Sequence, residues 1–233
     1  MLTAIIFDLD NTLTHRLHSI EHFSQYFFQR YQLQLLERNS QRIFDIIRET
    51  DNGGYGRPEN PHPKQKMSIA IRLHRELNWR ITPDIDEILH CWLTHFPKCS
   101  VEMPGAGPVL RNLKRQGYRL AVVSNGAEFS RHATLVELGF MSMLDAVISS
   151  GALGCKKPDI VIFDTVLRAL NCAPDKSVYV GDHPINDIHG ARDAGMHTVW
   201  LRGFHAWPAS VAAPQQSIDQ LTQLPDIIPL LCS

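Results

Sequence analysis

The 233-residue chain lacks several features that would place it in a specialised class of protein. No stretch reaches the roughly 20 apolar residues of a membrane-spanning helix, and the first residues, Met1-Leu2-Thr3, lack the cationic start of a secretory signal. With 23 basic and 24 acidic side chains the net charge is −1, so no basic surplus favours nucleic acid as an obligatory partner. We therefore predict a cytoplasmic protein with neither a nucleic-acid nor a membrane partner.

Disulfide and zinc patterns are absent as well. The five cysteines are odd in number and none stand in C-x-x-C spacing, which favours reduced thiols over a disulfide framework or a zinc site. Hydrophobic residues make up 44% of the chain, which is enough for a packed core. These absences leave a reduced globular protein, and its class has to come from its motifs.

Five short apolar runs along the chain are typical of buried strands. They are residues 4–7, 118–123, 146–149, 178–180 and 198–201. Helical patterns separate the last four runs, and alternation of this kind predicts parallel pairing with right-handed crossovers. The sequence therefore predicts an α/β fold around a parallel sheet.

Residues 15–96 break this alternation because they contain no convincing strand. Four apolar stripes at helical spacing predict a small helical bundle here, and a segment rich in glycine and proline, 51–63, predicts a loop between its halves. We expect two domains. Residues 1–14 and 97–233 form the α/β core, and residues 15–96 form an inserted helical domain.

Two carboxylates follow the first apolar run directly. Ile6 and Phe7 lead into Asp8, and Asp10 stands two positions further on. The carboxyl ends of strands in an open α/β sheet are where ligands bind. One acid can serve as nucleophile and the other as general acid and base, which suits phosphoryl transfer. The alternative is that Asp8 merely ends a strand and Asp10 caps a turn.

Three further segments carry polar residues to predicted strand ends. Ser124 and Asn125 follow the second run, where exposed amides can cradle an anion, although Ser124 is equally a candidate helix cap. Lys157 precedes a predicted helix, an unfavourable place for a cation unless something anionic lies nearby. Asp182 follows the fourth run, and Asp187 is a candidate either for the site or for a plain N-cap.

Adjacent strands would bring Asp8, Asp10 and Asp182 into one cleft, together with Asp187 if it belongs to the site. Carboxylates at that distance repel one another, and they stay ionised only beside cations. Lys157 and a bound divalent ion would supply the positive charge, and an oxygen-only ligand set favours Mg²⁺ over zinc. The charge pattern thus predicts a magnesium site facing a phosphate.

The order of these motifs resembles that of the haloacid dehalogenase (HAD) superfamily. D-x-D-x-T comes first, then Ser-Asn after a strand, Lys-Pro before a helix, and Gly-Asp followed by a later Asp. The match runs from the first strand to Gly195. It implies a phosphatase-like member with a Rossmann-like core, in which the helical insert is a type-one (C1) cap.

The resemblance also implies roles for the acids. Asp8 resembles the nucleophile that forms an aspartyl-phosphate, and Asp10 the acid that protonates the leaving alkoxide and then activates water. Asp8, the backbone carbonyl of Asp10, and Asp182 would hold Mg²⁺.

For the remaining motif residues the resemblance implies phosphate binding or support. Ser124 and the amide of Asn125 would bind phosphoryl oxygens, and Lys157, which directly precedes the proline, would stabilise charge on the nucleophile and the phosphate. Thr12 and Asp187 resemble supporting groups. His183 stands where many relatives carry serine, and its role stays open.

These roles predict a Mg²⁺-dependent hydrolase of small phosphate monoesters, acting on a small phosphorylated metabolite as a monomer or homodimer. A phosphomutase would keep Asp10 and stays an alternative. Haloacid dehalogenase-type C–halogen hydrolysis and phosphonate hydrolysis are disfavoured, since the enzymes that perform them lack this acid. A non-catalytic binding module is a further alternative. For substrate specificity we predict contacts from Arg57 or Lys64 in the glycine-rich loop and its flank.

Overall fold

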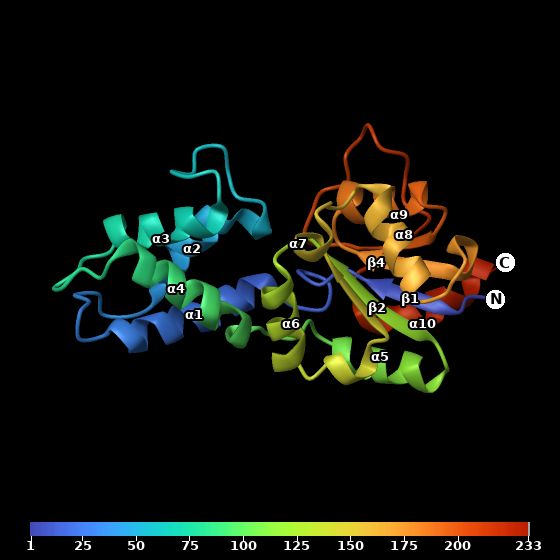
Figure 1. The fold of residues 1–233 in the computed structure, drawn as a ribbon, viewed down its shortest axis with the longest axis horizontal. Helices are drawn as coiled ribbons and strands as arrows, with labels where there is room; N and C mark the ends of the chain where they lie inside the picture. The colour runs from blue at the N-terminus through green and yellow to red at the C-terminus, as the bar shows by residue number, and fades with distance from the viewer. Residues whose placement is uncertain (233) are drawn as a thin grey trace. The chain divides into compact units, whose positions relative to one another are not determined.

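A six-stranded parallel sheet forms the centre of the α/β unit (Figure 1). The computed structural model describes residues 1–232, and the strand order is β3-β2-β1-β4-β5-β6. The strands are β1 (Ala4–Phe7), β2 (Arg119–Ser124), β3 (Ala146–Ser149), β4 (Ser177–Gly181), β5 (His197–Leu201) and β6 (Gln216–Ile218). Every pairing is parallel, which confirms the predicted α/β fold class. Sequence analysis missed β6, because Gln216-Ser217-Ile218 contains no apolar run.

The central position of β1 determines where the site lies. All four of its residues are fully buried, and Phe7 is in register with Val122 of β2 on one side and with Val180 of β4 on the other. The carboxyl ends of these three strands therefore meet at one edge of the sheet. The strand order reverses direction at β1, and in open α/β sheets such a switch point is the usual place for a ligand.

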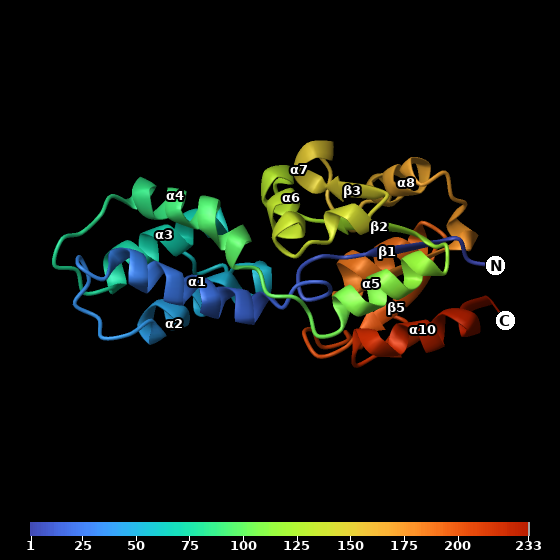
Figure 2. The ribbon, with the colours of Figure 1, turned by 90° about the horizontal axis from the view of Figure 1, so that it is seen from below.

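Helices cover both faces of the sheet (Figure 2). Alternate residues of β1 point to opposite faces, as the pleat requires. Ile5 and Phe7 pack in the core shared with α5 (Ala106–Arg115) and α10 (Leu224–Ile227). Ala4 and Ile6 pack in the core shared with α8 (Ile160–Ala169) and α9 (Gly190–Asp193). The remaining α-helices described in this unit are α6 (Glu128–Glu137) and the short α7 (Ser150–Leu153).

Between the fourth and fifth apolar runs the sequence pattern predicts a helix over residues 187–194, and the segment after β4 differs from it. A π-helix, η5 (Pro184–His189), comes first, and α9 follows it. This segment begins three residues earlier than expected. Pro184 stands in its first turn, and His183 Nδ1 accepts hydrogen bonds from the amides of Ile185 and Asn186, so both residues favour a helix start at this point.

The second unit consists of helices only. It comprises α1 (Arg16–Tyr31), α2 (Gln41–Asp51), α3 (Gln65–Glu76) and α4 (Ile85–His95), with the 3₁₀ segments η1 (Asn52–Gly54) and η2 (Phe96–Cys99). Its own aromatic-rich core includes Phe23, Phe27 and Trp92. A buried ion pair joins α1 to α2, with Arg16 Nη2 2.6 Å from Asp51 Oδ1.

The two compact units are residues 1–15 with 102 onward, and residues 16–101. The helical insert is expected to span residues 15–96, whereas the helical unit extends to residue 101. It extends further because Phe96 and Cys99 of η2 pack on its core. None of the helices described in residues 1–232 has both the length and the apolar character needed to cross a membrane. Four cysteines, Cys91, Cys99, Cys155 and Cys172, are free thiols, and the side chain of Cys232 lies outside the described part.

Candidate active site

Lys157 lies at the centre of a buried polar cluster at the carboxyl edge of the sheet. Its Nζ is 2.5 Å from Asp8 Oδ1, 2.6 Å from Asp187 Oδ1 and 3.0 Å from the Tyr179 hydroxyl. Asp8 directly follows β1, and its amide donates to the carbonyl of Val180 in β4. Lys157 is 3% exposed, so its ammonium is buried and not solvated, and Asp8 and Asp187 are the anionic groups that the sequence led us to expect beside it.

Burial and neighbouring charges shift the pKa values of this pair. Burial lowers the pKa of Lys157, but the charges of Asp187 and Asp8 outweigh burial and hold it well above its ordinary value. Burial raises the pKa of Asp8 to about 7 against the opposing charge of Lys157. Lys157 therefore stays an ammonium at neutral pH.

The cluster contains more acidic than basic side chains. Asp8, Asp182 and Asp187 are buried, and each offers a carboxylate oxygen within 4.8 Å of the others. Fully ionised, these three carboxylates would exceed the single positive charge of Lys157 by two. Burial, followed by the charges of Asp187 and Asp8, raises the pKa of Asp182 well above its ordinary value. Such a group could hold a metal ion, because a cation would offset this repulsion.

The surroundings of Asp182 give the most direct evidence that this carboxylate cluster could bind a cation. Its Oδ2 is buried and has no hydrogen-bond partner among residues 1–232, and His205 Nε2 stands 3.4 Å from it. Its backbone carbonyl accepts from the indole of Trp200 at 2.8 Å, which fixes the residue in place. Burial lowers the pKa of His205, so this histidine brings no charge to Asp182 at neutral pH. An oxygen-only donor set of this kind suits a hard cation.

Asp187 is a buried member of the cluster and does not cap a helix. Its Oδ2 accepts a hydrogen bond from the amide of His183 at 2.9 Å, and its Oδ1 accepts one from Lys157 Nζ. The cap at this point is His183, so the N-cap interpretation of Asp187 is wrong. A Cβ on Gly181 would lie 2.5 Å from Asp187 Oδ2, so glycine ends β4 because Asp187 packs against it.

Ser124 is the last residue of β2, and Asn125 begins the turn that follows. Ser124 is buried at the strand end, and α6 begins four residues later with Ala127 at its N-cap position, so the interpretation of Ser124 as a helix cap is wrong. The Asn125 side chain bonds both backbone groups of Lys157, with Oδ1 2.9 Å from the amide and Nδ2 3.2 Å from the carbonyl. Asn125 thus holds the lysine segment beside β2.

Asp10 and Thr12 belong to the turn that follows Asp8. The carbonyl of Leu9 accepts from the amides of Thr12, Leu13 and Thr14, which closes this turn tightly. The Asp10 side chain is 26% exposed and forms a 2.5 Å ion pair with Arg131 of α6. The hydroxyl of Thr12 is fully buried and has no hydrogen-bond partner in the described chain.

Sequence analysis missed several residues of this region. They are Arg131, Tyr179, Trp200 and His205. Arg131 and Asp10 are 121 positions apart, and a lone arginine in a helix has the pattern of a surface residue. Tyr179 and Trp200 lie within predicted strands, where aromatic residues usually indicate core packing.

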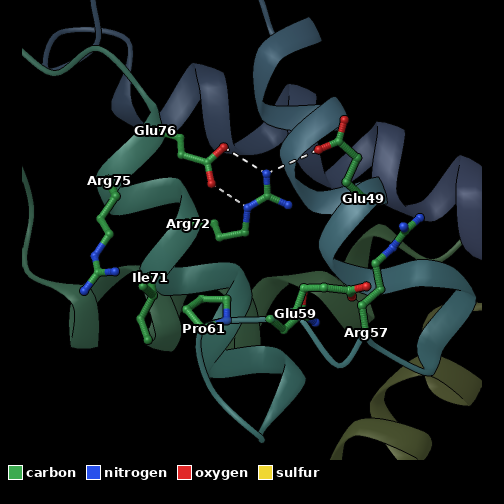
Figure 3. Close-up of a pocket in the computed structure, with 9 residues that line it drawn as sticks. Glu49, Arg57, Glu59, Pro61, Ile71, Arg72, Arg75 and Glu76 are labelled. Carbon is green, nitrogen blue, oxygen red and sulfur yellow. Dashed lines mark hydrogen bonds and ion pairs between the residues drawn. The ribbon is translucent and has the colours of Figure 1, made fainter.

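The two predicted specificity residues lie in the helical unit. Arg57 is exposed and lines a pocket of about 490 Å³, whereas Lys64 is exposed and does not line it. Figure 3 shows Arg72 between Glu76 and Glu49, which accept from its guanidinium at 2.5 Å and 3.2 Å. Arg72 is therefore neutralised within the pocket, while Arg57 has no ion pair among the described residues.

A parallel sheet with an Asp-x-Asp turn after its central strand and a buried lysine facing it defines a hydrolase of the HAD class. Residues 5–201 match the family model described as haloacid dehalogenase-like hydrolase, and the chain belongs to this family. The predicted resemblance is thereby confirmed.

Sequence relatives within the family include phosphatases. A glyceraldehyde 3-phosphate phosphatase of Methanothermobacter thermautotrophicus is 41% identical over 96 residues, which cover 41% of this chain and 42% of the relative. A phosphoserine phosphatase of Thermus thermophilus is 37% identical over 98 residues, which cover 42% of this chain and 39% of the relative. A haloacid dehalogenase-like hydrolase domain-containing protein 3 of Mus musculus is 32% identical over 155 residues, covering 65% and 59%. The chain thus spans between 39% and 59% of the length of these relatives.

Solved structures with the same fold cover nearly the whole chain. A HAD hydrolase of Bacillus subtilis bound to magnesium has a TM-score of 0.73 at 18% identity, covering 97% of this chain and 98% of its own. The L-2-haloacid dehalogenase of Xanthobacter autotrophicus with covalently bound chloropropionic acid has a TM-score of 0.74 at 18% identity, covering 98% and 99%. At these identities the likeness shows the fold alone.

Proposed function

We propose that this protein hydrolyses small phosphate monoesters in a Mg²⁺-dependent reaction that passes through an aspartyl-phosphate on Asp8. The observation that carries the proposal is the buried contact of 2.5 Å between Lys157 Nζ and Asp8 Oδ1 at the end of the central strand. An acid two positions further on, Asp10, and phosphatase names among the relatives support it. The helical unit is, in this proposal, the cap domain.

In the first half-reaction a carboxylate oxygen of Asp8 attacks phosphorus, and the bond from phosphorus to the ester oxygen breaks. Asp10 gives its proton to the leaving alkoxide, which departs as an alcohol. Lys157 stabilises charge on Asp8 and on the transferring phosphoryl group. The Ser124 hydroxyl and the Asn125 amide hold phosphoryl oxygens and so fix the in-line geometry that phosphoryl transfer requires.

In the second half-reaction the Asp10 carboxylate takes a proton from water. That water attacks phosphorus, and the bond between phosphorus and the Asp8 oxygen breaks. Inorganic phosphate leaves, Asp8 is again a carboxylate, and Asp10 is again protonated. Thr12 and Asp187 support the arrangement, with Asp187 Oδ1 holding the Lys157 ammonium at 2.6 Å.

Asp8, Asp182 and the backbone carbonyl of Asp10 would hold Mg²⁺. Asp187 fits a direct ligand role less well, because Lys157 and the His183 amide already occupy its oxygens. When bound, Mg²⁺ supplies positive charge that offsets the excess of carboxylates and polarises the phosphoryl group.

Phosphate release from a panel of esters tests the proposal. We expect release to fall at least roughly a hundredfold when EDTA removes the metal and to return with added Mg²⁺. The panel should include glyceraldehyde 3-phosphate, phosphoserine, phosphoglycolate, sugar phosphates and nucleoside monophosphates. Absence of free phosphate from every ester, or transfer of the phosphoryl group to a second sugar hydroxyl, would contradict hydrolysis.

We further propose that Arg57 or Lys64 contacts the leaving group. Both are exposed cations in one stretch of the helical unit. A lost charged hydrogen bond to the substrate predicts a roughly tenfold fall in kcat/KM for the best ester when both residues become alanine. Arg80→Ala, an exposed arginine outside the pocket of Figure 3, serves as the matched control. An unchanged kcat/KM in the double variant would exclude this contact.

A further inference from the structure

Arg131 combines deep burial with a contact to Asp10. The residue is 8% exposed, and its Nη1 is 2.5 Å from Asp10 Oδ2. Its Nε is buried and has no hydrogen-bond partner in the described part of the chain. Burying a guanidinium whose Nε lacks a hydrogen bond costs free energy, because that N–H loses its contact with water. A buried ion pair, in turn, adds little net stability compared with apolar packing. The pair is therefore poorly explained as a stabilising device.

Arg131 also lies against the turn that follows β2. A Cβ added to Gly126 would collide with the guanidinium, which means that the guanidinium packs directly on the backbone of this glycine. Gly126 comes two residues after Ser124, and its amide is held at 2.9 Å by the Ser150 hydroxyl. The turn is therefore a fixed support, and Arg131 bridges it to the carboxylate of Asp10.

We propose that Arg131 is a positioning residue that holds the Asp10 carboxylate in line with the ester oxygen of the substrate. The inference rests on the proposed function, in which Asp10 transfers protons. Arg131 projects from α6, packs on the fixed turn and bonds the Asp10 carboxylate, and this contact restricts the side-chain rotation of Asp10. Arg131 acts through Asp10 and does not contact the phosphoryl group.

This role predicts a dependence on the leaving group. An alkyl phosphate needs a proton on its departing oxygen, whereas p-nitrophenyl phosphate releases a stable phenolate without one. For Arg131→Met we expect kcat/KM on the best alkyl ester to fall roughly tenfold to a hundredfold, part of the usual contribution of a general acid. On p-nitrophenyl phosphate kcat/KM should stay within about twofold, since that constant reports the first half-reaction only.

The second half-reaction also needs Asp10, as the base for water. Arg131→Met should therefore release p-nitrophenol in a burst, with one equivalent per enzyme followed by a slow steady rate. Arg131→Lys, which retains a cation without the planar fork, should fall between wild type and Arg131→Met. If Arg131→Met does not fold, the comparison of the two esters is made with Arg131→Lys. Arg168→Met, on an 81% exposed side chain of α8, is the control and should match wild type.

The outcomes separate the two hypotheses. A fall in kcat/KM on the alkyl ester alone, together with the burst of p-nitrophenol, supports the positioning of Asp10 by Arg131. An equal fall in kcat/KM on both esters would overturn the positioning role in favour of a structural one. An equal rise in KM on both esters would overturn it in favour of direct phosphate binding. A wild-type enzyme that releases phosphate from neither ester would refute the proposed function, and this inference with it.

Discussion

The Asp8→Asn variant is expected to release phosphate at least about a thousandfold more slowly than the wild type, because an amide cannot attack phosphorus as a carboxylate does. The same change removes a negative charge from a cluster in which Asp182 and Asp187 lie close by. Without metal, the variant should therefore unfold at an unchanged or higher temperature. Activity and stability thus move apart, which separates loss of chemistry from loss of folding.

The measurement is phosphate release in Mg²⁺ together with thermal unfolding in EDTA. Asp175→Asn is the matched control, since the Asp175 side chain is 72% exposed, whereas Lys157 bonds to Asp8, Tyr179 and Asp187. The control should leave both quantities unchanged. An Asp8→Asn enzyme with more than about a tenth of wild-type activity would show that Asp8 is not the nucleophile.

The Lys157→Met variant should lose both activity and stability. It leaves Asp8 and Asp187 buried without the ammonium that pairs with them at 2.5 and 2.6 Å. Removing one member of a buried ion pair typically reduces the free energy of unfolding by about 3–5 kcal/mol. Lys156→Met is a closely matched control because Lys156 is the exposed neighbour, and it should change stability by no more than about 0.5 kcal/mol.

Denaturant unfolding at neutral pH and phosphate release check this prediction together. Metal should restore part of the lost stability in Lys157→Met, because a cation would take over some of the charge compensation. A Lys157→Met protein as stable and active as Lys156→Met would contradict the assignment of the lysine that directly precedes the proline.

The order of motifs in the sequence was enough to predict the centre of the fold. β1 and β3 have the predicted bounds, β2 and β4 differ from them by one residue at each end, and β5 begins one residue early. The agreement is close because buried runs of apolar residues have few other uses in a short segment. Parallel pairing then brings residues that end different strands to one edge. For this reason Asp8, Asp182 and Lys157 could be grouped without a structure.

Long-range side-chain contacts could not be predicted in this way. Arg131 meets Asp10 because α6 packs beside the turn after β1, and no local pattern encodes that contact. Likewise the Asn125 side chain bonds the backbone of Lys157 across 32 positions. His205 approaches Asp182 from the segment between β5 and β6, the strand that sequence analysis missed. Each of these contacts depends on tertiary packing, not on periodicity.

Trapping the phosphoryl-enzyme tests the central claim most directly. The enzyme is mixed with p-nitrophenyl phosphate and Mg²⁺ and quenched in acid within one turnover. Borohydride then reduces any acyl phosphate, and the peptide that contains residues 1–16 is sequenced by mass spectrometry. An Asp10→Asn enzyme, whose second half-reaction is slowed, provides a larger population of the intermediate. The account predicts phosphorylation and reduction at Asp8. Modification at another residue, or no modification while p-nitrophenol appears in a burst, would contradict it.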